Sequence, residues 1–373
     1  MKRIIVNGAN GYVASHFVGE LLAQGYRVVA LVRDSSQYSA FDRMKDALAE
    51  TNNEGITFDN LDVYSYSLLK EDFGISKDIM DDIFSKNVDY FHFAASLKYN
   101  LKSKDEIFET NLNGVENSVK VFLKHSKPGS RFFFISTAYS CGRFPGLFEE
   151  KFYDNEDISS FRNYYELSKR LAENNIKKHM DEDGLKANIV RLSQVVGNNK
   201  TGVTKTDYGI FDFARRVHNL ANKYPNKTIK IRVDPDSTQN LIPIDSVVNY
   251  LIKAVDAQEL PVIMNFVAKQ AVKNDQIVKT ICKLLPINII QDKSLERADM
   301  NAIERMIAIG MSFTGAYSDT NILFDTKNLD KIILSDDNQI TEQSLYNMLE
   351  YFINELTAKK KKNVAFTAVN DQG

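Results

Sequence analysis

The stretch IIVNGANGYVAS, residues 4–15, decides the fold because it joins a short apolar run to a turn built from small residues. Gly8 and Gly11 follow the apolar run, and Ala14 comes three residues later. A turn this tight favours residues without a bulky side chain, and small residues let backbone N–H groups approach a pyrophosphate at the start of the next helix. Since a strand is predicted before this turn and a helix after it, the stretch predicts a dinucleotide-binding loop.

Short apolar runs alternate with amphipathic stretches over the first 200 residues. The runs are rich in β-branched or aromatic residues and predict strands at 3–7, 27–33, 56–63, 88–95, 131–137 and 187–193. Apolar residues at helical spacing predict helices at 12–24, 39–50, 76–86, 104–125 and 163–181. This alternation indicates parallel strands joined by crossover helices, which is an α/β fold with a doubly wound parallel sheet of Rossmann type.

The pattern loosens after about residue 195 and becomes mainly helical. It predicts helices at 208–223 and 243–257, strands at 228–233 and 262–268, and a mainly helical region at 269–356. We therefore expect a dinucleotide-binding Rossmann domain and a smaller, mainly helical substrate-binding region. The first takes residues 1–200 and about 226–260, the second about 201–225 and 261–357, and a flexible Lys-rich tail takes 358–373.

Composition narrows the class of protein. The 373 residues are 43% hydrophobic and 26% charged, with a net charge of −2, so no global field attracts nucleic acid or anionic lipid. Two cysteines are too few for a disulfide framework, and no apolar run approaches the roughly 20 residues that span a bilayer. Five scattered histidines predict no metal site. The expectation is a soluble cytoplasmic protein without stable membrane insertion and without nucleic acid as a partner.

The end of the second predicted strand bears on the choice of dinucleotide. An acidic residue at this point normally accepts the ribose hydroxyls of NAD, but Arg33 stands there, and an arginine pairs with a 2′-phosphate. We therefore prefer NADP(H), while the adjacent Asp34 keeps NAD(H) possible. Asp62 and Val63, at the end of the third predicted strand, are expected to flank the adenine.

Four separated residues converge on one site if the sheet is as predicted. Tyr165 and Lys169 lie one helical turn apart, Thr137 ends the fifth strand, and Asn111 lies in the helix after the fourth. A free phenol has a pKa near about 10, and a nearby ammonium lowers it into the range of general acid–base catalysis. A hydroxyl holds the substrate oxygen, and an asparagine ties its helix to the lysine through water. Together these residue types suit hydride addition to a carbonyl group.

This set resembles the extended branch of the short-chain dehydrogenase/reductase superfamily. The matching text is NGANGYVA (7–14), HFAA (92–95), TNLNG (110–114), ISTAYSCG (135–142) and YELSK (165–169). The resemblance implies catalytic roles for Tyr165, Lys169, Thr137 and Asn111, with Thr137 preferred to Ser136. It also implies cofactor contacts at Gly8, Asn10, Gly11, Tyr12, Val13, Arg33, Asp62, Val63, Ala94, Ala95, Ser96, Tyr165, Lys169, Leu192 and Ser193.

Each of these residues also has a purely structural interpretation, as a helix-face aromatic, a solvated cation, a strand-end residue or a helix cap. Taken singly, that interpretation is the better one for every residue, but five motifs in the correct order favour function. His92 and Cys141 are interpreted as packing residues near the site, because no base–nucleophile partner is evident for either.

Two subgroups of the extended branch compete for the substrate. Nucleotide-sugar epimerases and dehydratases carry an arginine–aspartate pair where this chain has Gln239 and Asn240, although Arg232 lies close enough in sequence to replace that arginine. Fatty acyl-CoA reductases and thioester reductase domains are similar to this chain in YSAFDRMKDALAE (38–50), VVGNNKTG (195–202) and YSDTNILFDTKNLDKI (317–332). Apolar residues at 208–213 and 306–317 suit an acyl pocket or an ordinary core.

The sequence therefore predicts an NADP(H)-dependent oxidoreductase that reduces an acyl thioester or a hydrophobic aldehyde or ketone, with tyrosine as the proton donor. The substrate is a small molecule or an acyl group bound to a carrier protein or CoA. A nucleotide-sugar epimerase or dehydratase is the alternative, and a non-catalytic NADP sensor is the third interpretation. The resemblance also implies a possible homodimer through the helices at 104–125 and 163–181.

Overall fold

The computed structural model describes residues 2–51, 56–310, 314–333 and 339–370, and these residues divide into two compact units. Unit 1 comprises Met1–Ser193, Ser246–Val267 and Leu323–Asp336. Unit 2 comprises Gln194–Asp245, Ala268–Ile322 and Asp337–Gly373. The domain boundaries predicted from the sequence pattern stay a prediction.

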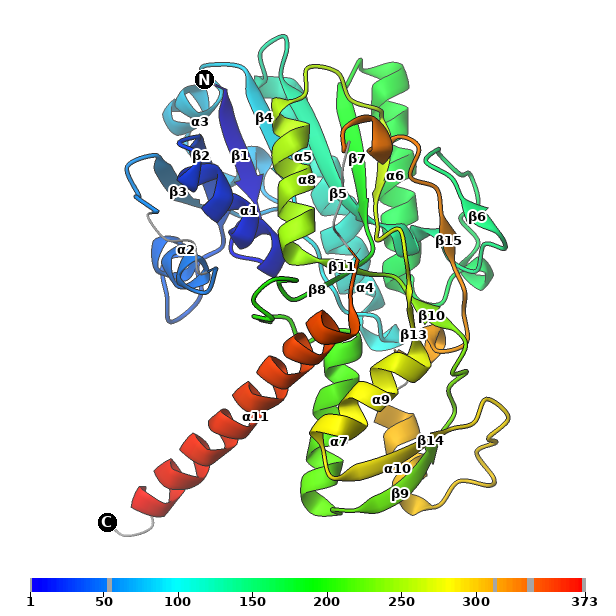
Figure 1. Ribbon diagram of the computed structural model, residues 1–373. Helices are drawn as coiled ribbons and strands as arrows, with labels where there is room; N and C mark the ends of the chain where they lie inside the picture. Colours follow the sequence, from blue (N-terminus) through cyan, green and yellow to red (C-terminus); the bar gives the residue numbers. More distant parts are fainter. Residues whose placement is uncertain (1, 52–55, 311–313, 334–338, 371–373) are drawn as a thin grey trace. The chain divides into compact units, whose positions relative to one another are not determined.

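Unit 1 is built on a seven-stranded sheet in the order β12-β7-β5-β4-β1-β2-β3, with every pair parallel. The strands are β1 Arg3–Asn7, β2 Arg27–Val32, β3 Leu61–Ser65, β4 Val88–His92, β5 Arg131–Thr137, β7 Ala187–Leu192 and β12 Ile263–Phe266. Helices cover both faces of this sheet (Figure 1). The predicted α/β fold with a doubly wound parallel sheet is confirmed, and the order changes direction between β1 and β4, where such sheets bind ligands.

The helices of unit 1 connect these strands. They are α1 Tyr12–Ala23, α2 Ala40–Ala49, α3 Lys77–Ile83, α4 Lys104–Phe108, α5 Gly114–His125, α6 Tyr164–Glu182 and most of α8 Ile244–Asp256. Short 3₁₀ turns lie at η1 Glu71–Gly74, η2 Leu101–Ser103, η4 Ala138–Cys141, η5 Ile158–Ser160 and η7 Leu329–Lys331. A two-stranded parallel ladder joins β6 Leu147–Phe148 to β15 Leu323–Phe324.

The core of unit 1 contains many aromatic side chains. Its central strands are buried on both faces, so they have no polar alternation. Phe132, Phe133 and Phe134 of β5 are all fully buried. The ring of Phe133 stacks on that of Phe91 in β4, with 4.3 Å between the centroids. Stacked aromatic rings across neighbouring strands fix the register that brings the strand ends together.

Unit 2 contains a helical core and short ladders. Its helices are α7 Ile210–Lys223, α9 Asn274–Leu284, α10 Ala302–Gly310 and α11 Glu342–Asn370, with the 3₁₀ turn η6 Thr314–Tyr317. Its strands are β8 Gln194–Val196, β9 Lys227–Ile231, β10 Thr238–Gln239, β11 Leu241–Pro243, β13 Val272–Lys273 and β14 Ile287–Gln291. Helices α7, α9 and α11 pack against one another around buried aliphatic side chains. Helix α11 runs to Asn370, and residues 371–373 of the predicted tail lie outside the described residues.

Two predicted elements differ from the structure. The third strand, predicted at 56–63, is β3 at Leu61–Ser65, because its register is set by Val28 of β2 lying opposite Leu61. The helix predicted at 104–125 is interrupted by a π-helical turn at Glu109–Asn113, which separates α4 from α5.

The strand predicted at 228–233 is present as β9, and it pairs with β14 inside unit 2.

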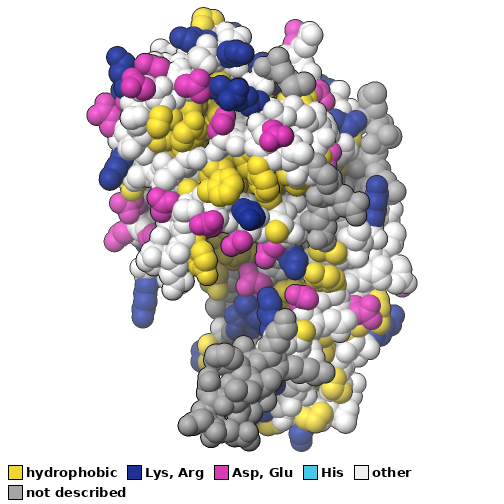
Figure 2. All heavy atoms as spheres, turned by 90° about the vertical axis from the view of Figure 1, so that its left-hand side faces the viewer, with side chains coloured by type: hydrophobic (Ala, Val, Ile, Leu, Met, Phe, Trp, Pro, Cys, Tyr) yellow, Lys and Arg dark blue, Asp and Glu magenta, His cyan; other side chains and the backbone are white. Residues whose placement is uncertain are grey.

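Among the described residues, the face drawn in Figure 2 carries no large region of one charge, because basic and acidic side chains are interspersed on it. This agrees with the net charge of −2. Across the part of the chain that the structure describes, no helix is both long and apolar enough to span a bilayer.

A group of ionisable side chains links α5 to α6 in unit 1. His179 of α6 lies 2.8 Å from Glu116 of α5 and 2.6 Å from Asp183. Burial opposes the charge on His179, but the hydrogen bonds to the two carboxylates raise its pKa above 6.5. Burial also opposes the charge on Glu116, yet hydrogen bonds from Lys120, Asn175 and His179 lower its pKa to about 2. The two helices are therefore held by an ion pair that depends on pH.

We expect this link to stabilise the fold most between pH 4.5 and 6.5, the unfolded pKa values of the two groups. Glu116 loses its contribution as the pH falls below 4.5 toward 2, and His179 loses its contribution as the pH rises through its raised pKa. In urea titrations, His179→Gln should lower the free energy of unfolding by about 1 kcal/mol near the middle of that window. The loss should shrink at alkaline pH, whereas Lys178→Gln on the same helix should show no such trend. A loss that is independent of pH contradicts this link.

Candidate active site

Asn7, the last residue of β1, ties the ends of the two central strands together. Its Oδ1 accepts hydrogen bonds from the backbone N–H groups of Phe93, at 2.8 Å, and Ala94, at 3.0 Å. Its Nδ2 donates to the Tyr90 hydroxyl at 3.0 Å and to His92 Nδ1 at 2.9 Å. Because the side chain is fully buried, these bonds hold the crevice between β1 and β4 in one shape. The sequence interpretation missed this residue, because its hydrogen-bond partners lie far from it along the chain.

His92 is a neutral structural residue with one defined tautomer. Since its Nδ1 accepts the hydrogen bond from Asn7, its Nε2 carries the hydrogen and donates to the carbonyl of Ala94 at 3.0 Å. Burial lowers the pKa of His92 to about 3, with the charge of Lys169 acting in the same direction. The interpretation of His92 as a packing residue agrees with these contacts.

The glycine turn after β1 has the shape of a phosphate-binding loop. Gly8 has a φ of +61°, and a Cβ there would lie 2.9 Å from the backbone nitrogen of Ala94. The N–H of Gly11 donates to the carbonyl of Gly8 at 2.9 Å and closes the turn. Helix α1 starts at Tyr12, and its N-cap residue is Gly11, which has no side chain to bond the first N–H groups. Its first N–H groups therefore suit a pyrophosphate, with Asn10, Tyr12 and Val13 beside the site.

Gly8→Ala should abolish dinucleotide binding, because the new methyl group pushes the turn away from Ala94 and because alanine is strained at a positive φ. Calorimetric titration with NADPH measures the loss. Gly25→Ala is the matched control, since Gly25 has a φ of +79° but an added Cβ would meet no atom within 4 Å. Equal binding losses in the two variants would mean that strain alone, and not the cradle at Ala94, explains the effect.

The end of β2 carries one engaged carboxylate and two arginines. The Asp34 carboxylate accepts hydrogen bonds from the Ser65 hydroxyl and from the N–H of Ala40, and these bonds lower its pKa. It is therefore engaged with its own chain. Arg33 is exposed, and Arg43 of α2 donates a hydrogen bond to the Arg33 carbonyl, which places two cations at this strand end. Arg43 was missed because its place beside β2 depends on how α2 packs.

Asp62 and Val63 do not lie at the carboxyl ends of the strands. Both are near the start of β3, opposite Val29 and Ala30 of β2, and Asp62 pairs with Arg27 at 3.2 Å. The strand ends at Ser65, so the structure does not bring Asp62 to the other predicted cofactor residues. The contact of Asp62 and Val63 with the adenine stays a prediction. It assumed that the third strand ends at residue 63, whereas β3 ends at Ser65.

Asn111 is the central residue of the π-helical turn and joins the β4 loop to α6. It is fully buried, and its Oδ1 accepts from the N–H of Ser96 at 2.7 Å. Its Nδ2 donates to the Ser96 carbonyl at 3.1 Å and to the Ser168 hydroxyl at 3.0 Å. Ser168 in turn donates to the carbonyl of Tyr165 at 2.8 Å. Asn111 is thus linked directly to α6 through Ser168, with both amide hydrogens used. The predicted link from Asn111 to Lys169 through water stays a prediction.

Lys169 is a buried ammonium one helical turn after Tyr165. Its Nζ donates to the carbonyl of Ile135 in β5 at 2.9 Å and lies 4.8 Å from the centre of the Phe134 ring. Burial lowers the pKa of Lys169 to about 8, while the charge of Glu173 acts in the opposite direction. Tyr165, on the same helix, is partly exposed. A buried cation beside an accessible phenol is the pattern expected of a tuned proton donor.

Ser136 and Thr137 point to opposite faces of β5 and have different partners. Ser136 donates to Glu173 at 2.5 Å, inside a buried ion pair of Glu173 with Arg191 at 2.7 Å. Thr137 donates to the carbonyl of Leu192 at 3.2 Å and caps the 3₁₀ turn η4 by accepting from the N–H of Tyr139. Ser136 is therefore committed to the interior, which supports the choice of Thr137 for the site.

The end of β7 supplies an observation that fits a bound dinucleotide. Within the part of the chain that the structure describes, the hydroxyl of Ser193 is buried and has no hydrogen-bond partner. An unpaired buried hydroxyl costs about 1–3 kcal/mol unless a ligand satisfies it. Two separate features of unit 1 therefore fit a nicotinamide dinucleotide: the glycine turn at Gly8 and the unpaired hydroxyl of Ser193. Ala94, Ala95, Ser96 and Leu192 lie at the same carboxyl edge, after β4 and at the end of β7.

The comparison with known families decides the classification. The model of the male sterility protein family, which describes an NAD-binding domain, matches residues 6–251. The chain belongs to this family. As the sequence predicts, it is a member of the extended short-chain dehydrogenases/reductases, a class of NAD(P)-dependent oxidoreductases. A nicotinamide dinucleotide is accordingly its cofactor class.

Curated relatives are distant, and each match covers only part of the relative. The chain is 25% identical over 269 residues to the L-2-aminoadipate reductase large subunit of Penicillium chrysogenum, a match that covers 67% of this chain and 18% of that protein. It is 24% identical over 149 residues to a Candida albicans protein provisionally named an NADPH-dependent methylglyoxal reductase, which covers 39% of this chain and 40% of that protein. The chain thus spans less than half the length of either relative.

Solved structures share the fold at low identity. The terminal R domain from the myxalamid PKS-NRPS pathway has a TM-score of 0.78 at 16% identity, covering 95% of this chain and 91% of that one. A thiolation-reductase di-domain from an archaeal non-ribosomal peptide synthetase has a TM-score of 0.75 at 16% identity, covering 96% and 76%. UDP-glucuronic acid 4-epimerase from Bacillus cereus has a TM-score of 0.66 at 15% identity, covering 95% and 99%.

Proposed function

We propose that this protein is an NADP(H)-dependent reductase of acyl thioesters or of hydrophobic aldehydes and ketones, with Tyr165 as the proton donor. The observation that carries the proposal is the buried ammonium of Lys169, held by the Ile135 carbonyl one helical turn from Tyr165. A lysine is rarely buried unless its charge has a task, and here the charge stabilises a phenolate.

A reduced nicotinamide dinucleotide held by the turn at Gly8 and the start of α1 would supply a hydride to the carbonyl carbon of the substrate. As the carbon–oxygen π electrons move to oxygen, Tyr165 donates its proton to that oxygen, and Lys169 stabilises the phenolate that remains. Thr137 holds the substrate oxygen after exchanging its hydrogen bond to Leu192 for one to the substrate. With a thioester, the product is a hemithioacetal that breaks down to an aldehyde and a free thiol.

Asn111 and Ser168 act as positioning residues. They fix the turn of α6 that carries Tyr165 and Lys169 relative to the loop after β4. Because the catalytic geometry tolerates only small displacements, this direct link sets the distance from the phenol to the strand ends.

The reductase is favoured over the nucleotide-sugar epimerase by the residues of unit 2. Gln239 occupies the position of the arginine that grips a diphosphate in the epimerases, and its amide donates to Asn274 and to the Tyr317 carbonyl. Arg232, which would have to replace that arginine, is exposed, whereas the neighbouring Val233 is buried. Neither observation supports a diphosphate site. The likeness to R domains and to a thiolation-reductase di-domain supports an acyl group carried by a carrier protein or by CoA.

Loss of NADPH absorbance with acyl-CoA, carrier-bound acyl and aldehyde substrates tests the proposal. Tyr165→Phe should lower kcat/KM by roughly 10²- to 10⁴-fold, because the proton donor is removed while the ring is kept. Tyr164→Phe is the matched control, since it removes the neighbouring phenol and should leave kcat/KM near the parent value. Absence of NADPH consumption over a broad substrate panel, or equal effects of the two substitutions, contradicts the proposal.

Activity should fall as the pH rises through about 8, because Lys169, with its pKa lowered to about 8 by burial, loses its charge there. Without that charge, the developing phenolate at Tyr165 is no longer stabilised. The profile of log kcat/KM against pH measures the fall. Lys169→Arg keeps a cation at all these pH values, so any remaining activity should persist to higher pH. An identical alkaline limb in both proteins contradicts the role of Lys169.

The preference for NADP(H) is tested at the end of β2. Arg33→Ala and Arg43→Ala should each weaken NADPH binding by roughly 10- to 100-fold, since a charge-assisted contact to phosphate is worth about 1.5–3 kcal/mol. Affinity for NADH should change little, because NADH lacks the 2′-phosphate. Arg232→Ala, in unit 2, is the control. Equal losses for both cofactors would show that the arginines do not read the phosphate.

A further inference from the structure

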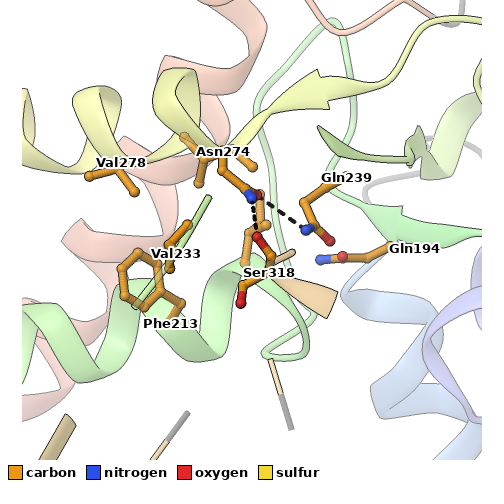
Figure 3. A pocket seen from close by; sticks show the side chains of 9 residues that line it. Gln194, Phe213, Val233, Gln239, Asn274, Val278 and Ser318 are labelled. Atoms are coloured by element: carbon orange, nitrogen blue, oxygen red, sulfur yellow. Dashed lines mark hydrogen bonds between the residues drawn. The ribbon is translucent and has the colours of Figure 1, made fainter. Parts of the chain in front are cut away.

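Unit 2 contains a pocket that the proposed chemistry does not use. It has a volume of about 50 Å³ and opens to solvent, so it takes a short segment of a ligand whose remainder extends outside. Figure 3 shows its lining, which comes from α7, α9, β8 and β10, and from the segments that follow β9 and η6. The lining residues are Gln194, Ile210, Phe213, Val233, Gln239, Asn274, Ile277, Val278 and Ser318.

The body of the pocket is apolar. Ile210 and Phe213 come from α7, Ile277 and Val278 from α9, and Val233 follows β9; all five are buried. These side chains also belong to the hydrophobic core of unit 2, so the walls of the pocket are firmly packed. Such walls suit an aliphatic chain or a small ring, which gains free energy by leaving water.

One side of the pocket presents a hydrogen-bond acceptor in a fixed orientation. Asn274 donates to the carbonyls of Asp234, at 2.9 Å, and Ser318, at 2.8 Å. Its Oδ1 accepts from Gln239 Nε2 at 3.2 Å, and the same nitrogen donates to the Tyr317 carbonyl at 2.9 Å. Both hydrogens of the Gln239 amide are therefore used inside the protein, and its Oε1 is the atom left to accept a hydrogen bond from a ligand.

A second amide presents a donor. The Nε2 atom of Gln194 is buried, and among the described residues it has no hydrogen-bond partner. The amide packs on the bare backbone of Gly209, where an added Cβ would overlap Nε2. Figure 3 shows both glutamine side chains extending into the pocket. A buried N–H without an acceptor is costly, so a ligand oxygen at this point would remove that cost.

The pocket also excludes charge, because none of its nine lining residues is ionisable. A carboxylate, phosphate or ammonium group would lose its hydration there without gaining an opposite charge. The combination of an apolar body, one donor and one acceptor selects a neutral ligand that carries a group with both a carbonyl oxygen and an N–H.

We infer that this pocket binds the uncharged acyl part of the substrate, and that the acyl part carries a secondary amide or an equivalent donor–acceptor group. The amide carbonyl accepts from Gln194 and its N–H donates to Gln239. The inference rests on the proposed function, because only a reductase makes this ligand a substrate. Binding of the ligand to the pocket does not depend on its reduction.

Calorimetric titration of the whole protein without cofactor tests the binding directly. The probes are N-methylhexanamide, 3-octanone, which keeps the carbonyl but lacks the N–H, and hexanoate, which is charged. N-methylhexanamide should bind at least fivefold more tightly than 3-octanone and at least tenfold more tightly than hexanoate, by the cost of unmade hydrogen bonds and of a buried charge. Equal binding of the ketone, or tighter binding of hexanoate, overturns the inference.

Two substitutions locate the effect. Gln194→Met keeps the length of the side chain but removes the donor, and Gly209→Ala displaces the amide; each should reduce the affinity for N-methylhexanamide at least fivefold. Gln343→Met, which replaces an exposed amide on α11, is the matched control and should change nothing. Melting temperatures of all variants establish that they fold. If both pocket variants fold and bind the amide like the parent, the pocket is not its site.

The two proposals fail separately. Amide binding that the pocket variants abolish, without NADPH consumption by any acyl substrate, would refute the reductase and keep the pocket as a neutral-ligand site. NADPH consumption in which kcat/KM does not distinguish amide-bearing from charged acyl thioesters would keep the reductase and overturn the inferred selectivity.

Discussion

The shape of the cofactor crevice depends on one buried amide. Asn7 receives two backbone N–H groups from the start of the loop after β4 and donates to Tyr90 and His92. These bonds hold β1 and β4 at the point where the strand order reverses, and they place the backbone of Ala94 against Gly8. The hydrogen bonds of Asn7 position three features that begin within a few residues of it or of its partners. These are the glycine turn, the start of α1 and the loop after β4 that binds Asn111.

The proposed chemistry depends on a charge that burial would ordinarily remove. Lys169 is 2% exposed, and the Ile135 carbonyl, the face of the Phe134 ring and the charge of Glu173 favour its protonated form. The same helix also carries Glu173, whose pairing with Arg191 anchors α6 to β7. One helix therefore combines a stable buried ion pair with a weakly stabilised ammonium, and the second is the one able to respond to a neighbouring phenol.

Much of this arrangement was predictable from the sequence, because it depends on the spacing of apolar residues and on the order of strands and helices along the chain. The glycine turn and the i, i+4 spacing of Tyr165 and Lys169 are local signals, and parallel topology follows from strand–helix alternation. The start of β3 was not predictable, since its register on β2 decides it. The role of Asn7 and the pocket around Gln239 depend on residues far apart in the sequence and on tertiary packing, for which spacing alone offers no signal.

The pKa of Lys169 in the folded protein is the most direct test of the central proposal, that a buried cation tunes the phenol of Tyr165. NMR titration of protein with ¹³C-labelled lysine Cε reports each ammonium separately. One resonance should titrate near pH 8 and be missing from Lys169→Arg, while the exposed lysines titrate near their usual value of about 10.4. If every lysine, including Lys169, titrates at that usual value, the ammonium is not desolvated and the proposed tuning of Tyr165 is wrong.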